Sequence, residues 1–342
     1  MFSRLTLVVL LSLYLTTFAI DISRYNNVDP TEEDMEELFG LYIMHRAPIR
    51  LEPSVERYNY FKSQVLDIIN HNRNPNKTWR RTITKFTGLT MKELEGFAIM
   101  AAQNCSATNR VSAKGLKDLP SYVDWREAGV VTPVKDQGKC GSCWTFSTVG
   151  AVEANWAIYK GGPSPLLSEQ QLVDCAGDYN NHGCSGGLPS QAFQYIQAAG
   201  GLQTEVDYPY KAANGTCYFD GSKVAASVYY GSHNITEGDE QALMEAVANV
   251  GPVSIAFQVT ADFKDYDGGV YVGQTCKSDP GSVNHAVLAV GYGHDDTSKL
   301  DYWIVKNSWT NQWGEEGYFR IQRGANMCGL AVCASYPQIK SP

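Results

Sequence analysis

The chain has 342 residues, nine of them cysteine, and a formal net charge of −8 at pH 7. This length supplies core for about two domains, and the cysteine count is typical of a protein that folds in an oxidising compartment. The acidic balance argues against nucleic acid as a partner, because binding to phosphates requires a basic surface.

The N-terminus carries an apolar run at residues 5–18, behind Arg4, and Thr17-Phe18-Ala19 offers small residues at the usual cleavage positions. The run is too short to span a membrane, and its composition predicts a secretory signal peptide at residues 1–19. No later stretch approaches 18 apolar residues, so we expect a soluble mature protein without a membrane anchor, either lysosomal or secreted. The secretory route also makes four sequons usable for N-glycosylation: Asn76, Asn104, Asn214 and Asn234.

Residues 20 to about 100 contain no cysteine and repeat apolar residues at helical spacing. The two clearest runs are Met35, Leu38, Phe39 and Ile43, and Phe61, Val65, Ile68 and Ile69. Up to residue 118 the chain has 15 Lys and Arg against 13 Asp and Glu, whereas from Leu119 onward it has 13 against 23. We therefore expect residues 20 to about 100 to form a helical module that is attracted to the acidic domain after it. Acid would weaken this attraction, because the carboxylates of that domain become protonated.

The stretch Gln-Gly-Lys-Cys-Gly-Ser-Cys-Trp, residues 137–144, leads into an apolar segment that Gly161 closes. This pattern predicts a buried helix that begins at Cys143. Ser142 is placed to cap that helix, and the first turn of a helix favours an anion. We therefore expect a lowered pKa for the Cys143 thiol, with partial thiolate character.

Helical signals continue to about residue 230, including a helix that Pro189 begins. A further helix is predicted at residues 240–250, and strands at residues 252–259, 285–291, 302–305 and 318–321. A helical half at about 128–230 packed against a β-rich half at about 231–338 is an α+β arrangement.

Two segments of the β-rich half supply partners for Cys143. His285 stands at the mouth of one apolar strand, and Asn307 stands at the end of the next strand. A thiolate needs an imidazolium partner, and the imidazole needs a group that fixes its tautomer and orientation. Alone, His285 would be an ordinary strand histidine and Asn307 a turn residue, but together the three predict a nucleophilic site between the halves.

Two other interpretations of the cysteines are weaker. A zinc site can be drawn from four residues at short spacing: Cys140, Cys143, His182 and Cys184. The oxidising secretory route disfavours that site, and no βαβ pattern supports a redox motif at Cys140 and Cys143. We therefore expect neither a metal nor a cofactor.

From Leu119 onward the motifs resemble those of the papain-like cysteine peptidases, in which a Cys-Gly-Ser-Cys-Trp segment precedes a His and an Asn. The resemblance implies a helical left domain, a β-barrel-like right domain and an inhibitory helical propeptide at residues 20–118. It implies a peptidase domain at residues 119–342 that acts on peptides and proteins as a monomer. The rival hypothesis from another class is a non-catalytic peptide-binding homologue that has kept the fold.

The resemblance also implies individual roles. Gln137 and the N–H group of Cys143 would form an oxyanion hole, and Trp309 would shield the hydrogen bond between His285 and Asn307. The residues implied to bind substrate are Gly186, Gly187, Leu188, Pro189, Val283, Ala286 and Trp309, the two glycines leaving room for an extended substrate backbone.

Three departures from the family pattern stand out. In the propeptide, Thr84 and Gly88 replace an Asn and an Asp, which puts the strength of inhibition and its acid trigger in question. In the peptidase domain, Thr310 stands where the family has Gly, so a strained turn is expected there.

With Cys143 kept free, eight cysteines remain, and the sequence alone permits about a hundred pairings of them. The resemblance implies Cys140–Cys184, Cys175–Cys217 and Cys276–Cys328, and it leaves Cys105 and Cys333. Residues 101–108 resemble the mini-chain that an aminopeptidase branch of the family keeps. A Cys105–Cys333 bridge would tether this segment in the cleft, where a carboxylate on Thr108 would face the α-ammonium group of a substrate. We therefore expect mainly an aminopeptidase, the alternative being an endopeptidase that loses the segment.

Overall fold

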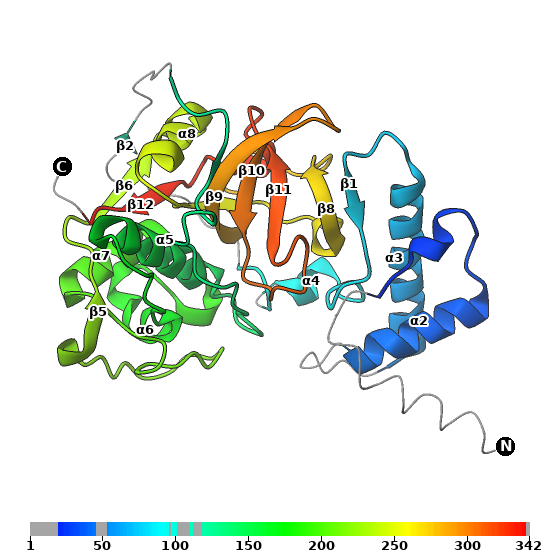
Figure 1. Cartoon of the computed structure of the whole chain (residues 1–342). Coiled ribbons are helices and arrows are strands. Elements are labelled where there is room, and N and C mark those ends of the chain that lie inside the picture. Colours follow the sequence, from blue (N-terminus) through cyan, green and yellow to red (C-terminus); the bar gives the residue numbers. More distant parts are fainter. Residues whose placement is uncertain (1–19, 46–52, 96, 101–109, 112–117, 340–342) are drawn as a thin grey trace.

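The computed structural model describes residues 20–45, 53–95, 97–100, 110–111 and 118–339. The predicted signal peptide and the mini-chain, with Asn104, Cys105 and Thr108, lie outside the described residues. Figure 1 shows three parts side by side: an N-terminal helical lobe, a central set of strands, and a group of helices on the far side of those strands.

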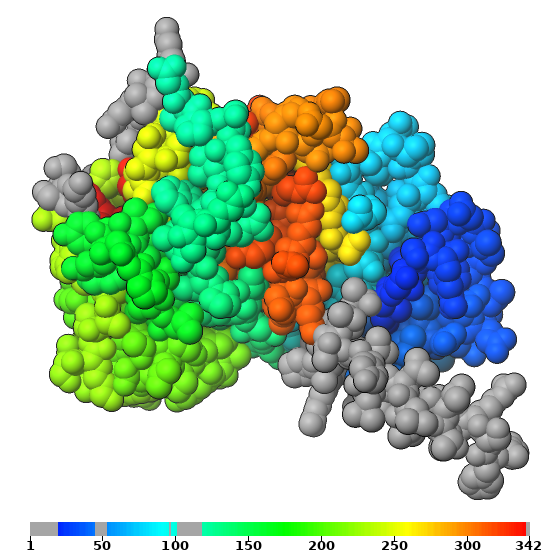
Figure 2. All heavy atoms as spheres, in the orientation of Figure 1, coloured from blue at the N-terminus to red at the C-terminus, as the bar shows by residue number. Residues whose placement is uncertain are grey.

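The N-terminal lobe is built on two helices, α2 (Glu32–His45) and α3 (Val55–Arg73). It also contains η1 (Ser23–Asn26), β1 (Trp79–Arg81) and α4 (Met91–Leu94). The helical repeats predicted from the sequence form its core, which Tyr42 joins as well. In the space-filling view the lobe, in blue, lies on the opposite side of the strands from the helices drawn in green (Figure 2).

The helical half is organised around α5 (Cys143–Lys160). This helix begins and ends where the sequence predicts, and its C-terminal cap is Gly161 at φ 68°. The other elements of this half are α6 (Glu169–Cys175), α7 (Pro189–Ala199), β4 (Leu202–Gln203), β5 (Val224–Ala226) and the short turns η2 (Gly177–Tyr179), η3 (Gly183–Ser185) and η4 (Gly221–Lys223). Thirteen of the 18 residues of α5 are buried, because the helix packs against α7 and against the sheet.

The β-rich half contains the predicted strands, most of them longer than predicted or shifted by a residue or two. Its elements are β3 (Val123–Asp124), β6 (Ser232–Ile235), α8 (Glu240–Asn249), β7 (Val253–Phe257), η5 (Phe263–Asp265), β8 (Tyr266–Tyr271), β9 (His285–Asp295), β10 (Leu300–Lys306), β11 (Tyr318–Gln322), η6 (Met327–Gly329) and β12 (Ser335–Pro337). In the described residues, the strand order is β1-β8-β11-β10-β9-β7-β12-β6-β2, with β3 paired to β9. The first and last members come from the segment before residue 119: β1, and β2 (Arg110–Val111).

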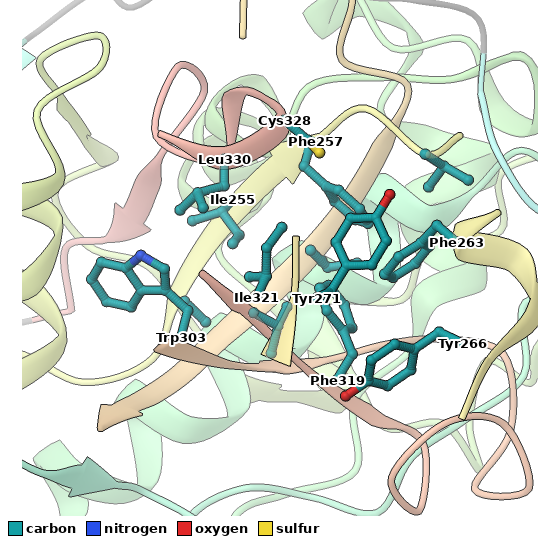
Figure 3. Close-up of a cluster of buried hydrophobic side chains, with 14 of the residues drawn as sticks. Ile255, Phe257, Phe263, Tyr266, Tyr271, Trp303, Phe319, Ile321, Cys328 and Leu330 are labelled. Carbon is teal, nitrogen blue, oxygen red and sulfur yellow. The ribbon is translucent and has the colours of Figure 1, made fainter. Parts of the chain in front are cut away.

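Aromatic and aliphatic side chains from these strands form the core of the β-rich half. Figure 3 shows part of this core, in which the rings of Phe257, Tyr271 and Phe319 all contact the ring of Phe263. Trp303 lies farther along the same cluster. Trp79 of β1 belongs to this cluster too, so the N-terminal lobe contributes to the same core as the peptidase strands.

The three disulfides implied by the family resemblance are formed: Cys140–Cys184, Cys175–Cys217 and Cys276–Cys328. The bond between Cys140 and Cys184 leaves neither sulfur available to zinc. Cys143 is a free, buried thiol, and Cys333 is disulfide-bonded.

Of the predicted sequons, Asn76 and Asn214 are exposed. Asn234 is only 1% exposed on β6, where β2 pairs with it, so this arrangement leaves no room for a glycan there. Within the described ranges, no helix is long and apolar enough to cross a membrane.

Candidate active site

The fold brings together the three residues predicted to form a nucleophilic site. Cys143 is the first residue of α5, His285 is the first residue of β9, and Asn307 directly follows β10. The Nε2 atom of His285 lies 2.8 Å from Oδ1 of Asn307. The backbone N–H of Ala286 donates to Sγ of Cys143 at 3.4 Å. Since the asparagine occupies Nε2, the other ring nitrogen, Nδ1, remains for the thiol.

Trp309 covers this pair on one side. Its indole stacks on the imidazole of His285, with ring centroids 4.8 Å apart and planes 27° apart. The indole is fully buried, so the hydrogen bond between His285 and Asn307 is screened from water. This is the shielding arrangement that the resemblance implies.

Gln137 is also at the site and is fully buried. Ser308 fixes its side chain, because the hydroxyl donates to Oε1 at 2.6 Å. The amide nitrogen Nε2, which donates to the carbonyl of Cys140 at 2.9 Å, is thereby oriented as a donor. No local sequence pattern points to this role of Ser308, because its partner Gln137 lies 171 residues earlier in the chain.

The predicted cap at Ser142 is wrong. Ser142 does occupy the N-cap position of α5, but its side chain makes no capping hydrogen bond. Its Oγ instead lies 2.6 Å from the hydroxyl of Tyr210. A tertiary partner competes for the serine hydroxyl, and a local pattern carries no information about that partner.

The prediction of a lowered thiol pKa is also wrong for this form of the chain. Burial raises the pKa of Cys143 to about 12, and the backbone N–H groups of Ala286 and Trp144 oppose the rise only in part. Burial likewise lowers the pKa of His285 to about 4, although the hydrogen bond with Asn307 acts to raise it. A helix N-terminus favours an anion by about 1 kcal/mol, whereas burying a charge costs several kcal/mol. The thiol and the imidazole are therefore both neutral here.

The cover that buries them is the segment at residues 97–100. The carbonyl of Phe97 accepts from the N–H of Cys140 at 3.0 Å, and the carbonyl of Ala98 accepts from Nε1 of Trp309 at 3.1 Å. The N–H of Met100 donates to the carbonyl of Asn284 at 2.9 Å. The segment thus lies across the site, where Cys143 and His285 are fully buried.

Two of the residues implied to bind substrate lie beside this segment. Val283 and Ala286 belong to the same buried cluster as Met100, and Leu188 and Pro189 are buried where α7 begins. A Cβ on Gly187 would lie 2.7 Å from the ring of Trp144. Packing against Trp144 therefore requires glycine at this position, whether or not a substrate also needs the space.

The rest of the N-terminal lobe is anchored beside the cleft. The ring of Phe86 meets Trp309 edge-on at 4.9 Å, and Arg81 pairs with the fully buried Asp265. At the two positions that depart from the family pattern, Thr84 donates to the carbonyl of Lys264 at 3.0 Å, and Gly88 packs beneath Tyr42. Thr84 therefore keeps a contact with the peptidase, whereas the contact of Gly88 lies within the lobe.

Thr310 has a φ of 76°, as its place in a family glycine position predicts. Its N–H donates to the carbonyl of Lys135 at 3.2 Å. A β-branched residue is a conformational outlier in the left-handed region, so the expected strain is present.

Comparison with known proteins agrees with this geometry. The profile of the family described as papain family cysteine protease matches residues 119–338. The chain is 51% identical over 285 residues to thiol protease aleurain of Arabidopsis thaliana, covering 83% of this chain and 78% of that protein. It is 49% identical over 297 residues to pro-cathepsin H of Bos taurus, covering 86% and 87%.

Among solved structures, digestive procathepsin L 3 of Tenebrio molitor superposes with a TM-score of 0.79 at 38% identity, covering 89% of this chain and 99% of that one. The proform of the ragweed pollen cysteine protease Amb a 11 superposes with a TM-score of 0.81 at 34% identity, covering 95% and 100%. These similarities extend over the N-terminal lobe as well as the two halves behind it. The chain belongs to the papain family of cysteine proteases.

Proposed function

We propose that this chain is the precursor of a cathepsin H-type peptidase that acts mainly as an aminopeptidase. In this proposal, residues 1–19 are a signal peptide, residues 20–118 a propeptide and residues 119–342 the peptidase, which is secreted or lysosomal. The segment at 101–108 is cut out of the propeptide and kept on the enzyme.

The observation that carries the proposal is the state of Cys333. Three disulfides and the free thiol of Cys143 account for seven of the nine cysteines, and Cys333 is disulfide-bonded. Cys333 also packs against the buried cluster that contains Met100, Val283 and Ala286. A segment tethered at Cys333 would therefore lie at the wall of the substrate pocket. We assign Cys105 as its partner, and the 49% identity to a protein named pro-cathepsin H supports that assignment.

The chemistry follows from the geometry of the site once residues 97–100 have left it. Exposure to water removes the desolvation that keeps the pair neutral, and a proton moves from Sγ of Cys143 to Nδ1 of His285. The thiolate attacks the peptide carbonyl, and the C–N bond breaks as His285 protonates the leaving amine. Water then hydrolyses the thioester with His285 as base. Asn307 orients the imidazole throughout.

The oxyanion that forms in both steps needs donors. Nε2 of Gln137, which Ser308 orients, and the N–H of Cys143 supply them. The retained segment adds specificity, because a carboxylate on Thr108 pairs with the α-ammonium group of a substrate. The same segment sterically excludes chains that extend farther into the cleft.

The test is intact mass and N-terminal sequencing of the matured enzyme, with and without reduction. The proposal expects an eight-residue peptide, with a glycan if Asn104 carries one, that is released only on reduction. The matured enzyme should cleave substrates with a free N-terminus and spare their N-acetylated forms. Cys105→Ser and Cys333→Ser should both shift activity toward internal cleavage. Equal cleavage of free and acetylated substrates by the wild type would contradict the proposal and favour an endopeptidase without the segment.

A further inference from the structure

One tyrosine ties together the two ends of the loop that leads into the catalytic helix. The hydroxyl of Tyr210 donates to the main-chain carbonyl of Gln137 at 2.8 Å. The same hydroxyl lies 2.6 Å from Oγ of Ser142. A phenol has one proton, and here that proton serves the Gln137 carbonyl, so Ser142 is the donor in the second bond.

The tyrosine is itself held in place. Its ring meets the ring of Phe146 on α5 edge-on, with centroids 5.0 Å apart. Its main-chain N–H donates to the carboxylate of Glu205 at 2.8 Å. Burial raises the pKa of the phenol, so the hydroxyl stays protonated and keeps its role as a donor. Tyr210 is thus a fixed point on the helical half.

The loop that Tyr210 spans carries both proposed oxyanion donors, one at each end. Gln137 contributes its side-chain amide, and the residue after Ser142 contributes its main-chain N–H. Such donors are effective only when they are fixed at about 3 Å from the developing charge before the reaction begins. A small change in the separation of the loop ends would therefore weaken oxyanion binding.

Other contacts of this loop act on different parts of it. The Cys140–Cys184 disulfide and the hydrogen bond from Gly141 to the carbonyl of Cys184 hold the middle of the loop. Ser308 holds the amide of the Gln137 side chain. The Tyr210 hydroxyl differs because it bonds the main chain at one end of the loop and the side chain at the other.

We propose that Tyr210 is a positioning residue of the oxyanion hole, with its hydroxyl holding Gln137 and Ser142 at the separation that the two donors require. This inference rests on the oxyanion role given to Gln137 under the proposed function. Neither Tyr210 nor its link to Ser142 has a local sequence signal, because the tyrosine lies 68 residues after the serine.

The first test is Tyr210→Phe in the matured enzyme, which keeps the ring packing against Phe146 and removes only the hydroxyl. We expect kcat on a peptide substrate to fall about tenfold with KM unchanged. The rate of Cys143 alkylation by iodoacetamide should stay the same, since alkylation does not form an oxyanion. Tyr292→Phe is the matched control: this hydroxyl donates to the carbonyl of Pro120 at 2.9 Å, far along β9 from His285, and its loss should leave kcat unchanged.

Ser142→Ala removes the other partner without touching the tyrosine ring, and it should lower kcat in the same direction. This variant decides the matter if Tyr210→Phe fails to fold. The proposal would be overturned if Ser142→Ala had an unchanged kcat and Tyr210→Phe either had an unchanged kcat or did not fold. A parallel fall in kcat and in the alkylation rate would also overturn it, because the tyrosine would then be shaping the thiol and not the oxyanion hole.

A double-mutant cycle separates this inference from the function on which it rests. Gln137→Ala alone should lower kcat by about 10², the typical loss for one oxyanion donor. Adding Tyr210→Phe to that variant should lower kcat by less than a further twofold, because the separation of the two donors no longer matters once one of them is gone. If the fall in kcat in the double variant equalled the product of the falls in the two single variants, the positioning role of Tyr210 would be overturned. Normal kcat in Gln137→Ala would instead refute the oxyanion assignment itself.

Discussion

The N-terminal lobe and the peptidase behind it differ in the ion pairs that each makes within itself. Within the lobe, ion pairs reach the surface: the carboxylates of Glu32 and Asp29, which pair with Lys62 and Arg73, are 56% and 85% exposed. The buried pair of Arg81 with Asp265 joins the two regions. In the peptidase, Lys135 bridges two carboxylates, on Glu153 and Glu169, that are 1% and 2% exposed. Exposed pairs contribute little and are screened by salt, whereas breaking a buried pair is strongly destabilising.

Covalent bonds add to this contrast. All three of the disulfides formed between described residues lie in the peptidase, and none of them ties the lobe. Disulfides of this kind stabilise mainly by restricting the unfolded chain. We therefore expect a change of pH or salt to loosen the lobe before it unfolds the peptidase.

The largest effect that separates the two regions concerns the nucleophile. Cys143→Ala, matured by another peptidase added in trans, should lose a factor of about 10⁴ to 10⁶ in kcat, the range known for catalytic triads. The stability of the lobe in the uncut precursor should not change, since the thiol contributes little to its packing. Turnover measured on the purified variant checks the first expectation, and thermal unfolding of the precursor checks the second. Retained turnover would refute the cysteine mechanism.

The second effect is the reactivity of the same thiol with and without its cover. A pKa of about 12 leaves a thiolate fraction of about 10⁻⁵ at pH 7. Iodoacetamide should therefore alkylate Cys143 at least about 10³-fold more slowly in the precursor than in the matured enzyme. The rate in the precursor should rise about tenfold per pH unit above neutrality. The Cys143→Ala precursor gives the background, and equal rates in the two forms would show that residues 97–100 do not control the thiol.

The third effect tests whether acid loosens the lobe. The pKa of Glu93 is lowered from 4.5 to about 2, and the largest cause is the hydrogen bond that it accepts from Arg57. A lowered pKa contributes stability above pH 4.5 that is lost as the pH falls from 4.5 toward 2. Allowing for solvent screening of this partly exposed pair, Glu93→Gln should destabilise the lobe by about 1 kcal/mol at pH 6.

Denaturant unfolding of the precursor between pH 6 and pH 3 measures this effect. The variant should also show a shallower loss of stability below pH 4.5 than the wild type. Asp29→Asn serves as the control, because its carboxylate is 85% exposed and should contribute little. If the stability of Glu93→Gln fell with pH as steeply as that of the wild type, groups other than Glu93 would be responsible for the acid sensitivity.

The smallest effect concerns strain within the peptidase. Thr310→Gly removes a β-branched residue from a φ of 76° and should raise stability by about 0.5–1 kcal/mol, without changing kcat. Thermal unfolding of the matured enzyme measures the gain. Lys299→Gly, at a φ of 58° but without branching at Cβ, should gain less. A lower kcat in Thr310→Gly would mean that the strained backbone at residue 310 helps to position the neighbouring Trp309.

Much of the site could be predicted because its residues stand in short motifs at the ends of regular elements. The apolar strand that follows His285 and the one that precedes Asn307 place those residues where the halves meet, and the family resemblance supplies the pairing of six cysteines. The burial of Asn234 was not predictable, since it depends on β2 pairing with β6 from more than 100 residues away.

By itself the sequence determined the family, the main helices, four strands of the β-rich half, and the identities of Cys143, His285 and Asn307, because each depends on residues that are near one another in the chain. Only the tertiary structure decided the state of those residues. The segment at 97–100 excludes water and so reverses the expected pKa shift of the thiol. Tyr210 likewise takes the serine hydroxyl that local spacing assigns to the helix cap. Desolvation and long-range hydrogen bonds arise only when distant segments meet, and local patterns do not encode them.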